Sequence, residues 1–193
     1  YIFLLVVVVL YASWPLFQPR FIPTHDGEYH IIRYSEFYGE LAAGHWFPRW
    51  APHLNSGYGL PLFIFHYPFP NYVGAFFRAI GASFVDSVKL TLAVGYISAT
   101  ALCFVWLRRR FSWFASAVGA VVFAMVPYWF VDIYVRGSVG EVLAIAFLMF
   151  SFVALEYNKR HLLALSLAGI VVSHNISAMM FFAMLLVYAF FRK

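Results

Sequence analysis

The sequence predicts an all-α protein, a polytopic transmembrane helical bundle with about six spans and a long outer first loop. Hydrophobic residues make up 64% of the 193 and charged residues only 11%, and the mean hydropathy is +0.80. This composition excludes a soluble globular domain. Lys and Arg gather in three clusters that follow alternate apolar segments, as the positive-inside rule requires of a multi-pass protein.

The first apolar segment covers residues 1–17 and is rich in β-branched residues, which a bilayer tolerates in a helix. It lacks the basic region and the cleavage site of a signal peptide, so we expect a membrane anchor. Five further apolar segments come later in the chain, and all but the first of them are shorter than the roughly 20 residues that a spanning helix needs. They are residues 88–107, 113–128, 142–155, 162–172 and 176–191.

The basic clusters predict the orientation. Residues 60–80 carry three prolines and are expected to lie on the membrane as a broken amphipathic element. All three basic clusters then fall on the cytoplasmic side of a cell membrane, with the N-terminus also inside and the first loop outside. We expect no nucleic acid partner. The clusters are Arg108-Arg109-Arg110, Lys159-Arg160 and Arg192-Lys193.

We expect residues 1–193 to be the N-terminal part of one module in a longer chain. The first span occupies residues 1–17, the outer loop residues 18–87, and the further spans residues 88–193. The lipid bilayer is the first predicted partner of this module.

The outer loop holds the first candidate site. A helix over residues 26–44 would place Asp26, His30, Arg33 and Phe37 on one stripe. The helix dipole favours an ionised Asp26 in the first turn, where it could accept a proton or hold a metal. The alternative is a capped amphipathic helix at the membrane interface, with Asp26 or Thr24 as the N-cap and with His30 and Arg33 merely solvated. Residues 45–52 and the turn at 55–59 follow without regular helix.

Two further polar groups share the outer face in this topology. Arg136 and Glu141 lie in the connection at residues 127–141, and His174 and Asn175 join the last two spans. Ionisable groups near span ends are usually functional. Arg136 could bind an anion while Glu141 orients the guanidinium. The alternative for Arg136 and Glu141 is a structural ion pair, and the alternative for His174 is an interfacial histidine that only hydrogen-bonds a neighbouring helix.

Several motifs together resemble a family of bacterial and archaeal membrane proteins, often labelled 6-pyruvoyl-tetrahydropterin synthase related, which looks like a branch of the GT-C glycosyltransferases. The resemblance covers nearly the whole chain. The motifs are His25-Asp26-Gly27 with His30 and Arg33, Pro48-Arg49-Trp50, Gly57-Tyr58-Gly59-Leu60-Pro61-Leu62-Phe63, Tyr134-Val135-Arg136-Gly137 with Glu141, and Ser173-His174-Asn175.

The resemblance implies an enzyme that transfers a sugar from a polyprenyl-phosphate carrier. It implies that Asp26 is the general base and that His30 assists it. No cofactor is certain, although a divalent metal could take part. The groups expected to bind the substrate and its phosphate are Arg33, Arg49, Arg136, Glu141, His174 and Asn175.

Two other functions compete with this interpretation. A transporter or flippase module would show broken helices with buried charges at mid-membrane, whereas the charges here lie at span ends and in the first loop. This difference favours the enzyme. A membrane metallohydrolase is third, because the sequence contains no His-Glu-x-x-His motif.

Overall fold

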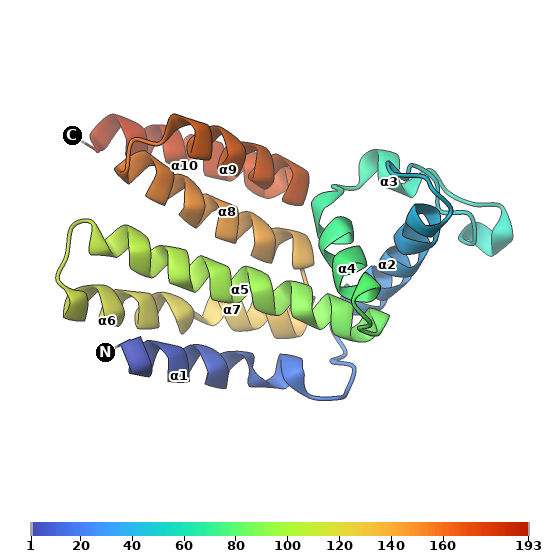
Figure 1. Cartoon of the computed structure of the whole chain (residues 1–193), viewed down its shortest axis with the longest axis horizontal. Helices are drawn as coiled ribbons and strands as arrows, with labels where there is room; N and C mark the ends of the chain where they lie inside the picture. The colour runs from blue at the N-terminus through green and yellow to red at the C-terminus, as the bar shows by residue number, and fades with distance from the viewer. Residues whose placement is uncertain (1, 193) are drawn as a thin grey trace.

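Near-parallel helices form an elongated bundle, and a smaller helical head lies at one end of it (Figure 1). This computed structural model describes residues 2–192. The predicted all-α class is confirmed, since β structure among these residues is limited to one bridge between Ala51 and Leu60. The bundle contains α1 (Ile2–Ser13) with η1 (Trp14–Phe17), α5 (Phe84–Arg108), α6 (Trp113–Ala124), α7 (Pro127–Phe130), η3 (Val131–Arg136), α8 (Val139–Glu156), α9 (Arg160–Ser173) and α10 (Asn175–Phe191).

Two of the described helices, α5 and α8, are long and apolar enough to cross a membrane. A third candidate is α6 together with Pro127–Arg136, which meets the same criteria as a pair but is bent by 41° at the break. The remaining helices of the bundle, Ile2–Phe17, α9 and α10, are apolar but shorter. The structure therefore supports a membrane protein with two or three helices able to span, and the count of about six stays a prediction.

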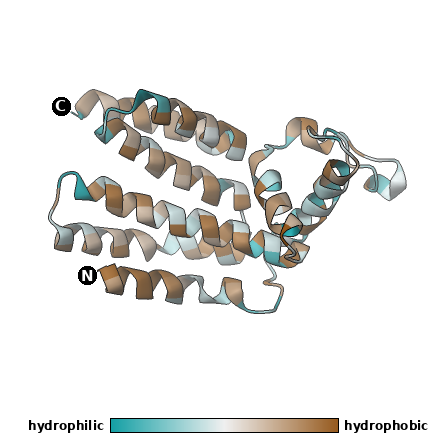
Figure 2. Ribbon diagram, in the orientation of Figure 1, coloured by the Kyte–Doolittle hydropathy of each residue, from teal (hydrophilic) through white to brown (hydrophobic). Residues whose placement is uncertain are grey.

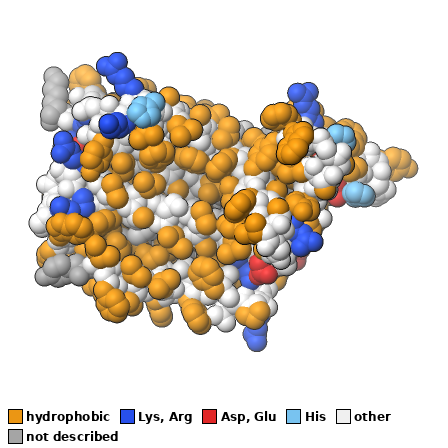
Figure 3. Space-filling view, in the orientation of Figure 1, with side chains coloured by type: hydrophobic (Ala, Val, Ile, Leu, Met, Phe, Trp, Pro, Cys, Tyr) orange, Lys and Arg blue, Asp and Glu red, His pale blue; other side chains and the backbone are white. Residues whose placement is uncertain are grey.

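Hydrophobic residues predominate along the helices of the bundle (Figure 2), and apolar side chains are spread over the face of the bundle that Figure 3 shows. Phe3 and Met179 are each 79% exposed, and Leu186 and Phe190 are each 73% exposed. Exposed apolar area on this scale is unfavourable in water and marks a surface that contacts lipid or another apolar partner. The flank of the bundle is thus suited to a bilayer.

The basic clusters meet at the end of the bundle opposite the head, where both chain ends also lie (Figure 1). Arg110 pairs with Glu156 at 2.8 Å and also donates to the carbonyl oxygen of Arg192. Arg192 in turn donates to the side chain of Asn158. The described residues of the three clusters thus lie at the same end of the bundle, and Lys193 lies outside the described residues. Their position on one side of a membrane, and the cytoplasmic identity of that side, stay predictions.

Several helix boundaries differ from the predictions by two to four residues, and two differences have a clear local cause. α5 begins at Phe84 and not at residue 88, because the hydroxyl of Ser83 caps the helix by accepting from the amide of Asp86 at 3.0 Å. The segment at residues 127–141, predicted to be a connection, is helical as far as Arg136. Gly137 then ends that helix at a φ of 73°, and α8 begins two residues later.

The head is built from α2 (Gly27–Ala42), η2 (Asn55–Gly57), α3 (Leu62–Phe65) and α4 (Phe69–Ala79). The predicted helix over residues 26–44 is confirmed. Residues 60–80 are broken as predicted, and α4 packs against both α2 and α5. A small core of Phe37, Ala51, Phe63 and Ala75 holds the head together. The location of this element on the membrane surface stays a prediction.

Candidate functional site

Polar side chains converge where the head meets the bundle. The amides of His25 and Asp26 donate to the carbonyl oxygens of Val135 and Arg136, each at 2.9 Å. Gly137 allows this contact, because a Cβ there would lie only 2.3 Å from the hydroxyl of Thr24. The segment before α2 is thus held by main-chain bonds against the end of the bent helix.

Asp26 occupies the N-cap position of α2, but its carboxylate does not cap the helix. The side chain is half-buried and makes no hydrogen bond or ion pair to any residue between 2 and 192. An Asp at an N-cap normally accepts from an amide of the first turn. The capping interpretation is therefore wrong for this side chain, which is left available for another acceptor role.

Arg136, whose side chain is 36% exposed, lies at the centre of an ionic cluster with two buried acids. Its Nη1 atom donates to Asp132 Oδ1 at 2.9 Å and to Glu141 Oε2 at 2.7 Å. The hydroxyl of Tyr128 accepts from the same nitrogen at 3.1 Å and donates to Glu141. Asp132 is fully buried and Glu141 is 6% exposed. Arg136 is therefore already paired with two acids of the same chain. This arrangement agrees with the alternative interpretation of Arg136 as a member of a structural ion pair.

Arg33 has a different environment. Its Nη1 atom lies 3.0 Å from His66 Nε2, and His66 Nδ1 lies 3.1 Å from the carbonyl oxygen of Tyr67. Since a carbonyl can only accept, Nδ1 carries the proton and Nε2 accepts from Arg33. Burial, reinforced by the charge of Arg33, lowers the pKa of His66 to about 4. The imidazole is thus neutral, and Arg33 pairs with no acid among the described residues.

The ring of Tyr67 contacts both His66, the partner of Arg33, and His174. Its ring centroid lies 4.0 Å from that of His66 and 5.2 Å from that of His174. Burial raises the pKa of its phenol; the charge of Arg33 opposes this rise and that of Asp26 adds to it. The charges of Arg33 and Asp26, which have no oppositely charged partner among the described residues, therefore both influence the pKa of Tyr67.

His30 lies beneath this surface and is only 2% exposed. Burial, followed by the charge of Arg33, lowers its pKa to about 3, so the ring is neutral at neutral pH. Its Nδ1 atom has no hydrogen-bond partner among the described residues, and the same is true of Asn71 Oδ1 and Asp132 Oδ2. The ring centroid of His66 lies 6.5 Å away. These contacts suit a residue that positions its neighbours.

His174 serves as a cap for α10. Its Nδ1 atom accepts from the hydroxyl of Ser177 at 2.7 Å and from its amide at 3.3 Å. Burial lowers the pKa of the ring, and the charge of Glu141 opposes this shift. Asn175 is exposed at the first position of the same helix. The hydrogen bonds of His174 therefore agree with the alternative interpretation, in which this residue is an interfacial histidine that hydrogen-bonds a neighbouring helix. Its ring also packs against Tyr67.

The structure does not bring Arg49 into this cluster. Arg49 is exposed and lines a separate hollow of about 480 Å³ in the head, together with Phe47, Phe63 and Tyr72. Of the predicted phosphate-binding residues, it is the one that stands apart from the contact between the head and the bundle.

Four residues of the site were missed in the sequence, namely His66, Tyr67, Tyr128 and Asp132. The spacing of Tyr128, Asp132 and Arg136 by four residues was a usable signal, because it places them on one helical face. His66 and Tyr67 stand between two prolines, where no periodicity marks them.

Among residues 2–192, no group of three or more His, Cys, Asp or Glu side chains is placed to hold a metal ion. In comparisons with protein-family models, curated proteins and solved structures, nothing matches this chain. The likeness to the GT-C glycosyltransferases and the participation of a divalent metal therefore stay predictions.

Proposed function

We propose that this protein is an integral membrane glycosyltransferase of the GT-C type, which transfers a sugar from a polyprenyl-phosphate carrier to an acceptor at the outer face of a cell membrane. One observation carries the proposal: the carboxylate of Asp26 and the guanidinium of Arg33 lack oppositely charged partners among the described residues. Seven positions of helix separate them by about 10 Å along one face. A base and an anion-binding group are thus available at the end of an apolar bundle.

The reaction follows from these two groups. The acceptor hydroxyl transfers its proton to Asp26, and its oxygen forms a bond to the anomeric carbon. The bond from that carbon to the phosphate oxygen breaks, and the electron pair stays on the lipid phosphate. Arg33 stabilises the charge that develops there. A single displacement of this kind inverts the anomeric centre.

The other residues act as positioning groups in this proposal. Arg136, balanced by its two acids, holds Asp26 through the main-chain bond to its carbonyl oxygen. His66 accepts from Arg33 and fixes the direction of the guanidinium. The buried ring of His30, with its centroid 6.5 Å from that of His66, packs next to His66. Arg49 remains outside the reacting centre.

The wider topology is part of the same proposal. The bent pair α6 and Pro127–Arg136 and the shorter apolar helices lie beside α5 and α8 in the bundle, and the basic clusters lie opposite the head (Figure 1). This arrangement supports the proposal of six spans with a cytoplasmic N-terminus, in which the site faces outward.

The decisive test is Asp26→Asn, with Glu28→Gln as the matched control, since Glu28 is an exposed acid in the first turn of the same helix. Transfer from a panel of radiolabelled polyprenyl-phosphate sugars is measured in proteoliposomes. Loss of a general base lowers turnover by about 100- to 10,000-fold, and the control keeps its activity. Near-normal transfer by Asp26→Asn, or no transfer from any donor by the unchanged protein, would refute the proposal.

A transporter or flippase is the second candidate, and the bent helix favours it. The break of 41° between α6 and Pro127–Arg136, with the fully buried Asp132 beyond it, is a feature of helices that line substrate paths. Asp132→Asn would then abolish lipid flipping in proteoliposomes, while Asp26→Asn would leave it intact. The opposite pattern, with transfer lost only in Asp26→Asn, supports the enzyme.

A further inference from the structure

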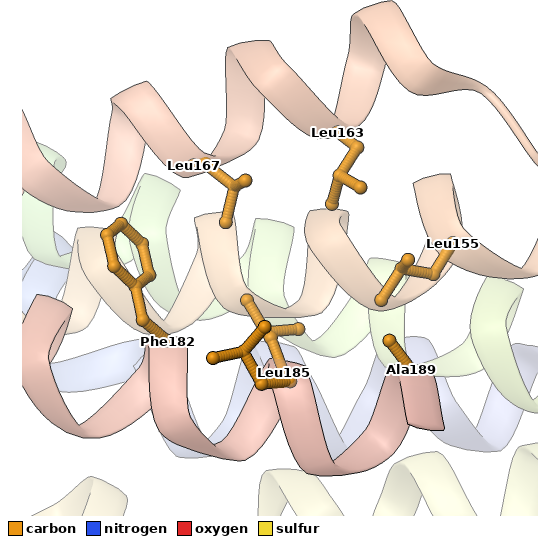
Figure 4. A pocket seen from close by; sticks show the side chains of 7 residues that line it. Leu155, Leu163, Leu167, Phe182, Leu185 and Ala189 are labelled. Carbon is orange, nitrogen blue, oxygen red and sulfur yellow. The ribbon is translucent and has the colours of Figure 1, made fainter. Parts of the chain in front are cut away.

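An apolar groove runs between α8, α9 and α10 on the flank of the bundle. Figure 4 shows the side chains of its lining converging from the three helices. The groove has a volume of about 260 Å³, and every residue that lines it is apolar. The main lining residues are Leu155, Leu163, Leu167, Phe182, Leu185 and Leu186.

A second hollow, of about 430 Å³, continues the groove toward the basic end of the bundle. The two share Leu155 and Leu163 as lining residues. Lys159, Arg160 and Arg192 line the second hollow, and no acid does so among the described residues.

The positive charge in this hollow is largely unpaired. Arg192 donates to Asn158, whereas Lys159 and Arg160 form no ion pair with any described residue. The acid at the end of α8, Glu156, is already bound to Arg110. The positive end of the dipole of α9, which begins at Arg160, adds to the attraction for an anion.

We propose that the groove and the hollow together form a binding site for an anionic phospholipid. The acyl chain lies in the apolar groove, and the phosphate lies beside Lys159 and Arg160. Basic pockets between membrane helices recognise anionic headgroups in this way. The site lies at the end of the bundle opposite the head and acts independently of the proposed transfer reaction.

The headgroup half of the site is tested by native mass spectrometry of the purified protein with phosphatidylglycerol and phosphatidylcholine of equal chain length. Each cation near an anionic lipid contributes about a factor of five, so two give a preference of about 30-fold for phosphatidylglycerol. The double variant Lys159→Gln/Arg160→Gln loses this preference. The control Arg108→Gln/Arg109→Gln removes the same charge at the same end without touching the hollow, and it keeps the preference.

The chain half of the site is tested by filling the groove. Leu186→Trp lowers the affinity for both lipids by at least about fourfold, the value of one buried methylene. Met179→Trp, on the same helix and similarly exposed but outside the lining of the groove, does not. Glycerol phosphate, which has no chains, fails to compete. The proposal would be overturned if the two lipids bound equally, or if both charge variants lost the preference to the same extent. It would also be overturned if glycerol phosphate competed, or if Leu186→Trp changed the oligomeric mass while lipid binding stayed the same.

Discussion

Replacing Arg136 by Gln tests whether this residue is structural. The substitution leaves Asp132, which is fully buried, and Glu141, which is 6% exposed, without the cation that balances them. Removing one partner of a buried ion pair costs about 3–5 kcal/mol. Because the Arg136 side chain is 36% exposed and partly screened by solvent, we expect a value near the low end, about 3 kcal/mol. For a chain of this length, each kcal/mol lowers the unfolding temperature by about 2–4 °C, so we expect a fall of about 6–12 °C. Thermal unfolding in detergent micelles, followed by tryptophan fluorescence, measures it.

Arg33→Gln is the matched comparison. It removes one hydrogen bond to the neutral His66 and breaks no ion pair, so it costs about 1 kcal/mol and about 2–4 °C. Its effect should appear in sugar transfer instead, because Arg33 is the proposed phosphate-binding group. The two arginines thus separate into one that holds the fold and one that serves the reaction.

A triple variant sharpens this test. Asp132→Asn/Arg136→Gln/Glu141→Gln removes all three charges together, and buried ionic groups replaced as a set often cost little. We expect it to recover at least half of the stability lost in Arg136→Gln. An Arg136→Gln protein that unfolds at the temperature of the unchanged protein, or a triple variant less stable than the single one, would refute the reasoning.

Three further predictions concern stability and topology. His30 and His66 stay neutral in the fold because burial lowers their pKa values to about 3 and about 4, so the unfolded chain takes up protons first as the pH falls below about 6.5. Acidification from pH 7 to 5 should therefore cost about 2 kcal/mol for each of these two histidines, and His30→Gln should remove about half of this pH dependence in melts across that range. Gly140→Ala should destabilise the protein by about 1–3 kcal/mol in the same melts, since the new Cβ would lie 2.5 Å from the ring of Tyr67. The control Gly39→Ala, whose Cβ would enter open space on α2, should stabilise the protein by up to about 1 kcal/mol. The variants Tyr58→Cys and His161→Cys, both at exposed positions, should react with a membrane-impermeant thiol reagent from opposite sides of the membrane. Labelling of both variants from the same side would overturn the proposed topology.

Apolar runs predicted the helices of the bundle because burial and lipid exposure both select the same residue types. The start of α5 was missed because Ser83 and Asp86 are polar residues, and only their mutual capping geometry makes them part of a helix. The helix after Pro127 was missed for a related reason: a proline is tolerated at the first helical position, where it removes no hydrogen bond.

The candidate site could be predicted where its residues share one local segment. Asp26 and Arg33 lie on one helix, so their spacing was informative. The contact of Arg33 with His66 and that of Tyr67 with His174 join residues far apart in the sequence. Such contacts depend on how the head packs on the bundle, and no local pattern encodes them.

The main-chain bonds from His25 and Asp26 to the end of the bent helix have a consequence for sequence variation. They use amide and carbonyl groups that every residue except proline carries, so the backbone of this junction does not depend on the side chains at these positions. A substitution at His25 or Asp26, even one that removes the proposed general base, can therefore abolish the reaction while the loop that carries it keeps its path. Gly137 is the position where such freedom ends, because any larger residue would collide with Thr24 and separate the two segments.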